Sequence, residues 1–341
     1  MTSHQSEPVL PKGSLVLVTG ATGFIAGHII LEALQLGYKV RGTVRSKQKA
    51  NQNEAIFSKL GFGDSYSTVI VEDMAANGAF DEAVKGCDSI IHAASVLTFS
   101  PNPEEVIPPV VAGTTGILKA AKKEQKVKRV VYTSSSTAAL IPKPNTELYI
   151  DKDTWDDEAC DIARNAKPPY DPSSGFAIYA ASKTEAERAV WKFVKEEKPD
   201  FVVNCVLPNA NMGRAIPGGS VSSTGSWVPT VYKGGLDSLK DFPPQYYINV
   251  TDDARLHVAA AVLEPIEGER VFAFAEPYNW NDIMDAIKKA KPDFKVQHIP
   301  QDKDLSKVDT KLAVELLKKW WGQDGFTSLE EGVRQNLEGL D

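Results

Sequence analysis

Cysteine is scarce in this chain, with three in 341 residues: Cys87, Cys160 and Cys205. Three residues so widely separated cannot form a disulfide framework, and their spacing matches no metal-binding cluster. Two of them lie in apolar runs, where a cysteine usually packs as a small hydrophobic side chain. The sequence therefore predicts neither structural disulfides nor a metal centre.

The chain also lacks an excess of positive charge and long apolar segments. Its formal net charge is −7, so we expect no basic surface for nucleic acid or for an anionic membrane. The polar stretch 1–8 has no apolar signal core, and no apolar run is long enough to span a bilayer. We expect no nucleic-acid partner, no membrane partner and a location in the reducing cytoplasm.

What the chain does have is an alternation of strand-like and helix-like segments from residue 14 to about residue 129. Helical periodicity is clear over 23–36 and again near 114–123. The strand candidates are 15–18, 39–44, 68–71, 89–93 and 129–134. Repeated strand–helix units with short glycine-marked turns predict an α/β fold with a doubly wound parallel sheet of the Rossmann type.

The pattern changes after Leu140. Residues 141–175 are rich in Pro, Asp, Asn and Ser and are expected to form a long excursion, followed by a helix over 178–195 and a strand over 201–207. Further on, strands near 246–250 and 271–274 alternate with helices near 252–263, 279–289, 310–319 and 328–337. We predict a Rossmann domain over 9–208. Residues 209–341 should be mostly a smaller substrate-binding lobe, interleaved with returning Rossmann elements.

The most informative segment is 15–26, where an apolar run ends in a glycine turn and passes directly into a helical pattern. Gly20 and Gly23 would let the backbone approach a ligand, and Ala26 would let the helix pack closely on the strand. The free amides and positive dipole end of a helix N-terminus suit a pyrophosphate. The spacing G-x-x-G-x-x-A differs from the usual dinucleotide fingerprint, and glycine pairs are common in ordinary turns. Its position after the first strand favours the nucleotide-binding interpretation.

Tyr179 and Lys183 stand four residues apart in a helical segment, so their side chains share one helix face. A free tyrosine has a pKa of about 10 and is a poor acid–base catalyst at neutral pH. A nearby ammonium group favours the phenolate and should lower the pKa of Tyr179 toward the working range. Ten tyrosines would give about one such pair by chance, so the spacing alone is weak, although only Tyr179 has it.

Four hydroxyl residues, Thr133 to Ser136, follow the apolar strand predicted before them. They should lie at the carboxyl edge of the sheet, where open α/β sheets bind ligands. For Thr133 and Ser136 we expect the ordinary role of capping the next turn. One other hydroxyl of the set could hold a substrate carbonyl oxygen.

With the glycine turn, the hydroxyl cluster and the Tyr–Lys pair in this order, the chain resembles the extended short-chain dehydrogenase/reductase family. The resemblance covers nearly the whole chain from about residue 9. It is strongest with the dihydroflavonol-reductase-like branch, and there with fungal NADPH-dependent aldehyde (carbonyl) reductases, through segments 13–20, 139–145 and 179–187. It implies a reductase that transfers a hydride from NADPH to the carbonyl group of an aldehyde or ketone and produces an alcohol.

The resemblance also implies a role for each matching residue. Tyr179 would donate the proton, Lys183 would bind the nicotinamide ribose and lower the tyrosine pKa, and Ser135 would orient the carbonyl oxygen. His92 is expected to be structural. Asp73 would lie near the adenine, residues 93–95 would line the cofactor channel, and Pro208 would contact the nicotinamide. The expected cofactor contacts are Gly20, Thr22, Gly23, Phe24, Ile25, Arg41, Arg45, Asp73, Met74, Ala93, Ala94, Ser95, Tyr179, Lys183 and Pro208.

The second predicted strand indicates which dinucleotide is used. NAD-specific proteins of this fold carry an acidic residue at the end of that strand to bind the adenosine ribose. Here Val44 stands in that position, Arg45 follows it and Arg41 precedes it by three residues. A guanidinium can bind a 2′-phosphate with paired charge-assisted hydrogen bonds. We therefore predict NADPH, with Arg45 the larger contributor.

Two segments depart from the family pattern. Residues 110–116 lack both asparagines that the family often carries there, so a proton relay through that helix is not expected. Residues 176–178, just before Tyr179, differ from the signature of cinnamoyl-CoA reductases, which argues against a CoA thioester substrate.

The substrate pocket is expected to be apolar and aromatic, which favours a hydrophobic or aryl carbonyl compound or a ketoester over a sugar. Each of its candidate residues could equally belong to the core. Segments 141–175 and 209–235 are expected to cover the nicotinamide end of the cleft, the second being mobile without ligand. The candidate pocket residues are Val96, Leu97, Phe99, Phe176, Asn209, Trp227 and Tyr232.

Two other functions are compatible with the fold. A nucleotide-sugar epimerase or dehydratase would need cations for a sugar diphosphate, and residues 210–240 offer Arg214, Lys233 and Lys240. A non-enzymatic NADP-sensing regulator is disfavoured because the predicted catalytic residues are intact. The expected partner is a small-molecule carbonyl substrate, and the expected state is a monomer or homodimer.

Overall fold

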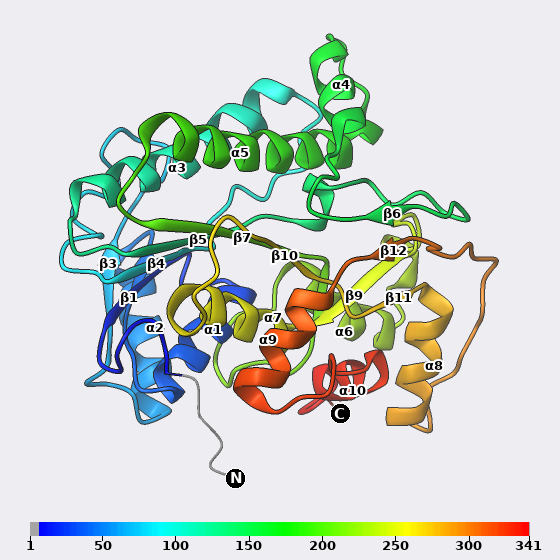
Figure 1. Ribbon diagram of the computed structural model, residues 1–341. Helices are drawn as coiled ribbons and strands as arrows, with labels where there is room; N and C mark the ends of the chain where they lie inside the picture. Colours follow the sequence, from blue (N-terminus) through cyan, green and yellow to red (C-terminus); the bar gives the residue numbers. More distant parts are fainter. Residues whose placement is uncertain (1–6, 341) are drawn as a thin grey trace.

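The computed structural model describes residues 7–340, and its centre is a sheet of seven parallel strands in the order β10-β7-β5-β4-β1-β2-β3 (Figure 1). Continuous apolar runs form the inner strands, because helices cover both faces of the sheet and leave no strand face in water. The strands are β1 (Leu15–Thr19), β2 (Lys39–Val44), β3 (Tyr66–Ile70), β4 (Ser89–His92), β5 (Arg129–Thr133), β7 (Val202–Pro208) and β10 (Arg270–Ala273).

The strand order reverses between β1 and β4. The chain adds β2 and β3 on one side of β1, and then returns to place β4, β5, β7 and β10 on the other side. Open α/β sheets bind their ligands outside the carboxyl ends of the strands at such a switch point. The doubly wound parallel sheet predicted from the sequence is confirmed, and the glycine turn after β1 lies at this point.

Helices pack on both faces of the sheet (Figure 1). One face carries α1, α7 and α9, and its core includes Ile29, Val258 and Leu317. The opposite face carries α3 and α5, which lie side by side. The helices of these layers are α1 (Phe24–Gln35), α2 (Lys47–Lys59), α3 (Pro103–Lys123), α5 (Gly175–Glu197), α7 (Val250–Val258) and α9 (Lys311–Trp321).

Helix α3 is longer than the sequence pattern predicts. The expectation was a helix near 114–123, but α3 begins at Pro103 and continues through Pro108 and Pro109. Interior prolines usually end or kink a helix because they lack the amide hydrogen. Here Val106 and Val110, on either side of the two prolines, are buried, and their packing stabilises the first half of the helix.

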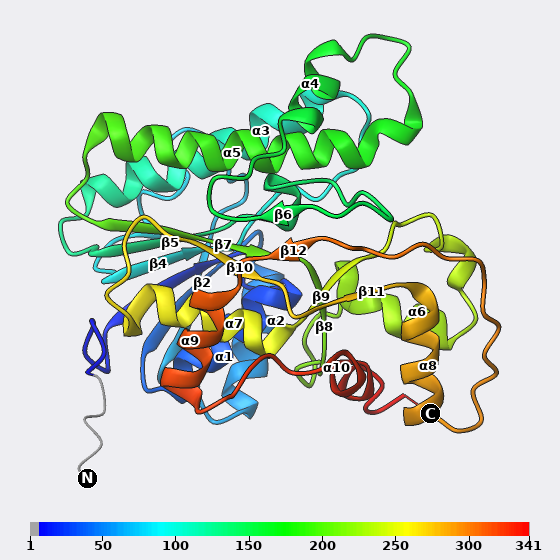
Figure 2. The same cartoon turned by 45° about the vertical axis from the view of Figure 1, so that its right-hand side comes forward.

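The excursion at 141–175 contains more regular structure than expected. Strand β6 (Tyr149–Ile150) pairs with the distant β12 (Lys307–Val308). Helix α4 (Asp157–Asn165) lies on the side of α5 that faces away from the sheet (Figure 2), where Cys160 and Ile178 share a small apolar cluster. Two short 3-10 turns, η1 (Ser136–Ala138) and η2 (Pro172–Ser174), flank the excursion.

The chain after β7 divides between the main sheet and a smaller lobe. Strand β10 and helices α7 and α9 belong to the main unit, and a π-turn, η5 (Ala259–Leu263), extends α7. The lobe has its own apolar core, which includes Trp280 and Tyr247. Its elements are β8 (Ala210–Met212), β9 (Gln245–Asn249), β11 (Glu276–Tyr278), α6 (Trp227–Tyr232), α8 (Trp280–Ala290) and α10 (Leu329–Asn336), with the 3-10 turns η3 (Ser223–Ser226) and η4 (Leu236–Ser238).

Residues 7–340 contain neither a candidate membrane-spanning helix nor a candidate metal cluster. No helix in that range combines the length and apolar character needed to cross a bilayer. Within the same residues, no group of three or more His, Cys, Asp and Glu side chains is arranged to hold a metal ion.

Candidate active site

The glycine turn between β1 and α1 is fixed by contacts with the neighbouring strand ends. Gly20 has φ +70°, and an added Cβ there would lie 3.0 Å from the Cα of Ala94, just beyond β4. The amide of Gly20 donates to Thr43 Oγ1 at 3.0 Å, and the amide of Ala21 donates to the Thr43 carbonyl at 3.0 Å. A side chain at position 20 would therefore collide with the end of β4, and the turn requires glycine.

Helix α1 begins at this turn with its first amides uncapped. No side chain caps the N-terminus at Gly23, and no acidic residue lies in the first turn. The first four amides of a helix have no partner within the helix, so this end can receive an anion. Across the turn, Ser95 Oγ is buried without a hydrogen-bond partner in the described structure. An uncapped helix end beside a close backbone approach and an unpartnered hydroxyl fits the pyrophosphate and adjacent sugar of a dinucleotide.

The two arginines of the second strand are not equivalent. Arg45 follows β2, is exposed, and has no ion pair within residues 7–340. Arg41 lies within β2 and donates to the carbonyls of Ala83 and Lys85 at 2.9 and 2.7 Å. The contribution of Arg41 to phosphate binding stays a prediction, and backbone carbonyls in the turn before β4 already occupy its Nη1.

The other predicted adenine-side residues lie beyond β3. Asp73 is exposed, and its carboxylate accepts the amide of Ala75 at 2.8 Å. Met74 is half-buried and packs against Gly113 of α3, where an added Cβ would lie 2.7 Å from the methionine methyl group. The position of Met74 is thus fixed by α3.

His92, at the end of β4, is confirmed as a structural residue. Its Nδ1 is 2.9 Å from Thr19 Oγ1, and its ring lies between those of Phe80 and Tyr132. Burial lowers the pKa of His92 to about 3, and the positive charge of Lys183 acts in the same direction. The imidazole is neutral at physiological pH and fixes the start of segment 93–95.

Strand β5 and helix α5 position the three predicted catalytic residues, Ser135, Tyr179 and Lys183. Ser135 follows β5 directly, and Tyr179 and Lys183 lie one turn apart near the start of α5. Ser135 Oγ accepts hydrogen bonds from the amide and the hydroxyl of Thr137, at 3.2 and 3.0 Å. Both of its lone pairs are thus engaged, and its own hydrogen is directed elsewhere.

Lys183 is buried and held at the end of β5. Its Nζ donates to Tyr132 Oη at 3.0 Å and to the carbonyl of Thr133 at 2.8 Å. Burial lowers the pKa of Lys183 to about 8, and the negative charge of Glu187 partly opposes the shift. The ammonium group is therefore close to its titration range at physiological pH.

Lys183 was expected to lower the pKa of Tyr179, but the structure indicates that this pKa is raised. Burial raises the pKa of Tyr179, and the nearby Ser135 hydroxyl partly opposes that shift. The cause is the removal of the phenol from water, while the ammonium of Lys183 donates to Tyr132 and Thr133. The phenol of Tyr179 is consequently protonated at neutral pH in the structure as described.

The remaining hydroxyls after β5 have structural partners. Thr133 Oγ1 is 2.9 Å from Nε2 of the buried His257, so the expectation that Thr133 caps the next turn is wrong, and the cap of that turn is the side chain of Ser135. Ser134 Oγ donates to Glu187 at 2.6 Å, and Arg270 donates to the same carboxylate at 2.7 Å. This buried ion pair connects α5 with β10 and leaves Ser135 as the hydroxyl of the cluster that faces Tyr179.

Aromatic side chains surround Tyr179. The rings of Phe99 and Phe176 have centroids 5.4 and 6.5 Å from that of Tyr179. Phe242 extends the cluster, with centroids 6.2 Å from Phe176 and 4.9 Å from Trp227. Phe99, Phe176 and Trp227 are thus brought together as predicted, and Phe242 joins them although its loop offered no periodic signal.

The other predicted pocket residues have less connection with this cluster. Tyr232 packs on Phe294 in the lobe, at 6.1 Å between centroids, and is removed from the set of pocket candidates. Asn209 is partly occupied, because its side-chain oxygen accepts the amide of Ala210 at 2.8 Å. Val96 packs on the core below α3, while Leu97 is exposed.

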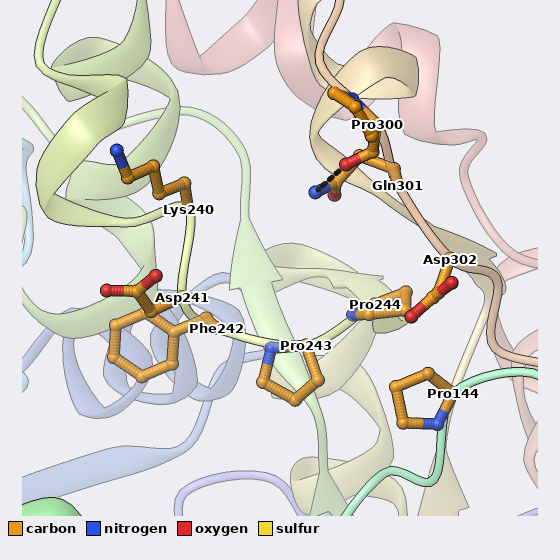
Figure 3. Close-up of a pocket in the computed structure, with 9 residues that line it drawn as sticks. All are labelled: Pro144, Lys240, Asp241, Phe242, Pro243, Pro244, Pro300, Gln301 and Asp302. Atoms are coloured by element: carbon orange, nitrogen blue, oxygen red, sulfur yellow. Dashed lines mark hydrogen bonds between the residues drawn. The ribbon is translucent and has the colours of Figure 1, made fainter.

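A surface pocket of about 530 Å³ lies next to the aromatic cluster (Figure 3). It is formed by loops 240–244 and 300–302 together with Pro144 of the excursion. Phe242 is common to the pocket and the cluster, whereas Ser135, Tyr179 and Lys183 do not line it. The pocket therefore borders the candidate site and is not the place of reaction.

The segment between β8 and α6 lies elsewhere than predicted. An added Cβ at Gly225 would lie 2.6 Å from the Phe24 ring, and one at Gly27 would lie 3.3 Å from Ile216. This part of the chain covers the first half of α1, next to the glycine turn. The expectation that all of 209–235 covers the nicotinamide end is corrected for residues 213–226.

Comparisons with known proteins agree with this arrangement. Residues 16–210 match the NAD dependent epimerase/dehydratase family. Aldehyde reductase 2 of Sporidiobolus salmonicolor is 43% identical over 332 residues, which cover 96% of each chain. An Aspergillus terreus protein named only as an NAD-dependent epimerase/dehydratase is 39% identical over 339 residues, 98% of each chain.

A solved structure gives the same result for the fold. Yeast methylglyoxal/isovaleraldehyde reductase complexed with NADPH superposes with a TM-score of 0.77 at 26% identity, covering 94% of this chain and 96% of that one. The similarity to reductases confirms the resemblance that the motifs predicted. The chain, with its glycine turn at the switch point and its Ser–Tyr–Lys arrangement, belongs to the NAD dependent epimerase/dehydratase family.

Proposed function

We propose that this protein is an NADPH-dependent reductase that converts aldehydes or ketones to alcohols. The observation that carries the proposal is the placement of Ser135, Tyr179 and Lys183 at the adjoining ends of β5 and α5. The two similar proteins named as reductases, the fungal aldehyde reductase and the yeast enzyme solved with NADPH, support the same reaction.

The three side chains have complementary roles in carbonyl reduction. NADPH supplies the hydride when it is bound. The Ser135 hydroxyl donates to the carbonyl oxygen, since its lone pairs are already engaged by Thr137. Tyr179 gives the proton to that oxygen, and its raised pKa keeps the phenol protonated beforehand. The positive charge of Lys183 stabilises the phenolate that remains.

The residues proposed to hold the dinucleotide lie along the carboxyl edge of the sheet. The turn at 20–25 would receive the pyrophosphate, and Arg45 the 2′-phosphate. Asp73 and Met74 would lie on the adenine side, residues 93–95 along the channel, and Pro208 and Lys183 at the nicotinamide end. Because no acidic residue stands at the end of β2, we propose a preference for NADPH over NADH.

The proposed substrates are hydrophobic or aryl carbonyl compounds, including ketoesters. The aromatic rings of Phe99 and Phe176 beside Tyr179 suit a flat or apolar substituent. A sugar diphosphate would need free cations, but Arg214 pairs with Glu338 at 2.6 Å and Lys240 pairs with Asp237 at 2.9 Å. Of the three cations in segment 210–240, Lys233 alone has no ion pair within residues 7–340, and a single free lysine supports a reductase over a nucleotide-sugar epimerase.

A spectrophotometric screen tests the function directly. Purified protein is incubated with NADPH or NADH and a panel of aryl aldehydes, aliphatic aldehydes, ketones and ketoesters, with UDP-sugars as a separate arm. We expect consumption of NADPH with formation of the alcohol, fastest for the aryl compounds, and little reaction with NADH. Conversion of a UDP-sugar without a carbonyl reduction would identify an epimerase, and no turnover on any substrate would favour a regulator. The cytoplasmic location and the monomeric or homodimeric state stay predictions.

A further inference from the structure

Tyr132, the fourth residue of β5, makes direct contact with the ammonium group of Lys183. Its Oη is 3.0 Å from Lys183 Nζ, and the ammonium also lies 4.7 Å from the centroid of the Tyr132 ring. Both side chains are 2% exposed, so water does not compete for these interactions. In the sequence, Tyr132 is distinguished only as part of the predicted apolar strand 129–134.

We propose that Tyr132 is the positioning residue for Lys183, holding its ammonium through a hydrogen bond to the phenolic oxygen and a cation–π contact with the ring. The inference rests on the proposed reductase function, because Lys183 acts on Tyr179 in that reaction. Tyr132 acts through Lys183 and is not assigned a contact with substrate or cofactor.

The hydrogen bond between Lys183 and Tyr132 has a defined direction, with Lys183 as the donor. An ammonium group has donors and no acceptor, so the Tyr132 oxygen accepts from Lys183. The hydroxyl of Thr114 on α3 also acts on Tyr132, because it partly opposes the rise that burial causes in the pKa of the Tyr132 phenol. Thr114 Oγ1 in turn donates to the carbonyl of Val110 at 2.8 Å. Segment 110–116 contains no asparagine, and Thr114 is the polar side chain that this part of α3 provides for the contact.

Lys183 depends on this acceptor because it is buried. Burying a charged group raises the free energy of the folded state unless its hydrogens are bonded. Within residues 7–340, the only other acceptor of Lys183 Nζ is the Thr133 carbonyl. Removal of the Tyr132 hydroxyl would eliminate the hydrogen bond to Lys183, and removal of the ring would also eliminate the cation–π contact. The hydroxyl alone can be removed by Tyr132→Phe, which leaves the ring in place.

The groups that face Lys183 determine how its pKa should respond. Glu187, one turn further along α5, favours the ammonium form. His92 on β4 is neutral at assay pH because burial lowers its pKa to about 3, and burial raises the pKa of the Cys205 thiol on β7 well above its usual range. Burial also raises the pKa values of Tyr132 and Tyr179, so both phenols are neutral. Loss of the Tyr132 acceptor should therefore lower the pKa of Lys183 further.

The test compares Tyr132→Phe with the unmodified enzyme in the steady-state reduction of an aryl aldehyde by NADPH over a range of pH. We expect kcat to fall by roughly tenfold, as for the loss of a hydrogen bond to a charged group. The KM for the aldehyde should change by less than about twofold, since uniform substrate binding is unaffected. The alkaline decline of kcat/KM should move to lower pH by about one unit, because the acceptor that stabilises the ammonium is gone.

Two further variants separate positioning from a general loss of packing. Tyr38→Phe removes another buried hydroxyl, which donates to the Leu10 carbonyl at 3.0 Å on the far side of the sheet, and should leave kcat and the pH profile unchanged. Thr114→Val should reproduce part of the Tyr132→Phe effect, while Thr114→Ser retains the hydroxyl and should restore the original profile. If Tyr132→Phe does not fold, the Thr114 pair decides the question in the same assays.

The outcomes distinguish this inference from the proposed function. An unmodified protein that reduces no carbonyl compound would reject the reductase function itself. An active unmodified enzyme whose Tyr132→Phe variant keeps its kcat and pH profile would reject the role of Tyr132 alone. Equal effects of Tyr132→Phe and Tyr38→Phe would likewise show that lost packing, and not the hydroxyl at Lys183, is responsible.

Discussion

Arg41 and Arg45 have similar positions in the sequence but different surroundings in the structure. Arg41 lies within a strand, and its guanidinium bonds to two backbone carbonyls, whereas Arg45 lies just beyond the strand end and is exposed. Both bonds leave from Nη1 of Arg41, so that nitrogen has no hydrogen left for a phosphate. At the scale of single residues, selection of the 2′-phosphate should therefore depend on Arg45.

The substitution Arg45→Ala is expected to weaken NADPH binding by roughly 10- to 100-fold, since paired hydrogen bonds between charged groups would be lost. NADH binding should be nearly unchanged, because NADH has no 2′-phosphate. Fluorescence titration with each dinucleotide measures both effects. Arg164→Ala is the matched control, as Arg164 is an exposed arginine that pairs with Asp161 on α4. Equal losses for NADPH and NADH, or no loss, would contradict the assignment.

The residues that approach each other through local spacing could be predicted from the sequence. Tyr179 and Lys183 share a helix face because they are four residues apart, and Ser135 follows a recognisable strand. The contacts that set their electrostatics are not local. Lys183 donates to Tyr132, 51 positions earlier in the chain. The predicted pKa direction of Tyr179 was wrong because burial, which depends on the whole fold, raises that pKa.

At the scale of elements, the glycine turn connects β1 to α1 and sets the position of the uncapped helix end. Gly20 adopts a backbone conformation with positive φ, and an added Cβ would also meet Ala94 at 3.0 Å. Gly61, after α2, has φ +90° with no heavy atom within 4 Å of an added Cβ. Substitutions at Gly20 and Gly61 can therefore be compared: both would introduce backbone strain, but only a side chain at position 20 would also collide with the end of β4.

We expect Gly61→Ala to lower the free energy of unfolding by about 1 kcal/mol through strain alone, with no change in NADPH affinity. Gly20→Ala should destabilise the protein more and should also weaken NADPH binding, because the turn must move away from β4. Urea unfolding and fluorescence titration measure the two quantities. Unaltered NADPH binding by a folded Gly20→Ala protein would remove the turn from the cofactor site.

Prediction of the elements succeeded where one periodicity dominates and failed where local signals conflict with packing. The capping box of Asn279 and Asp282 starts α8 close to the predicted residue. In contrast, the first half of α3 was not predicted because Pro108 and Pro109 normally end a helix. This half is stabilised by burial against α5 and α4. Strand β6 was missed because its partner β12 is more than 150 residues away.

At the scale of the whole molecule, residues 213–226 connect the lobe to the helix that begins at the glycine turn. An added Cβ at Gly225 would lie 2.6 Å from the Phe24 ring, and one at Gly218 would lie 3.5 Å from Ile56 of α2, so this segment crosses both helices. A bound dinucleotide at the turn would lie next to it. Coupling between cofactor binding and the order of this segment is therefore expected.

Hydrogen exchange with and without NADPH tests this coupling. Amides in 213–226 should gain protection on binding, because the segment lies over the N-terminal half of α1. Helix α4, which packs on the outer side of α5, serves as the internal control and should be unaffected. Protection confined to α4, or absent from 213–226, would show that closure over the cofactor involves another part of the chain.

The division between domain and lobe could be predicted only approximately, for a topological reason. Strand β10 enters the main sheet beside β7, α7 packs on α1, and α9 packs on α7 and β10, although all three follow the start of the lobe. Short strands such as β8 and β9 do not indicate in the sequence which sheet they will join. Their assignment is decided by pairing partners that are distant along the chain.

The proton-donor role of Tyr179 is the central claim, and a comparison of Tyr179→Phe with Tyr149→Phe tests it most directly. Tyr149 is 64% exposed on β6, so its variant controls for the loss of one phenolic hydroxyl. The measurement is single-turnover reduction of a reactive aryl aldehyde by pre-bound NADPH, with NADPH affinity determined by fluorescence titration. We predict that both variants bind NADPH normally, and that Tyr179→Phe reduces the aldehyde roughly 10²–10⁴-fold more slowly while Tyr149→Phe is unchanged. Reduction by Tyr179→Phe at close to the original rate, with NADPH bound, would contradict the account.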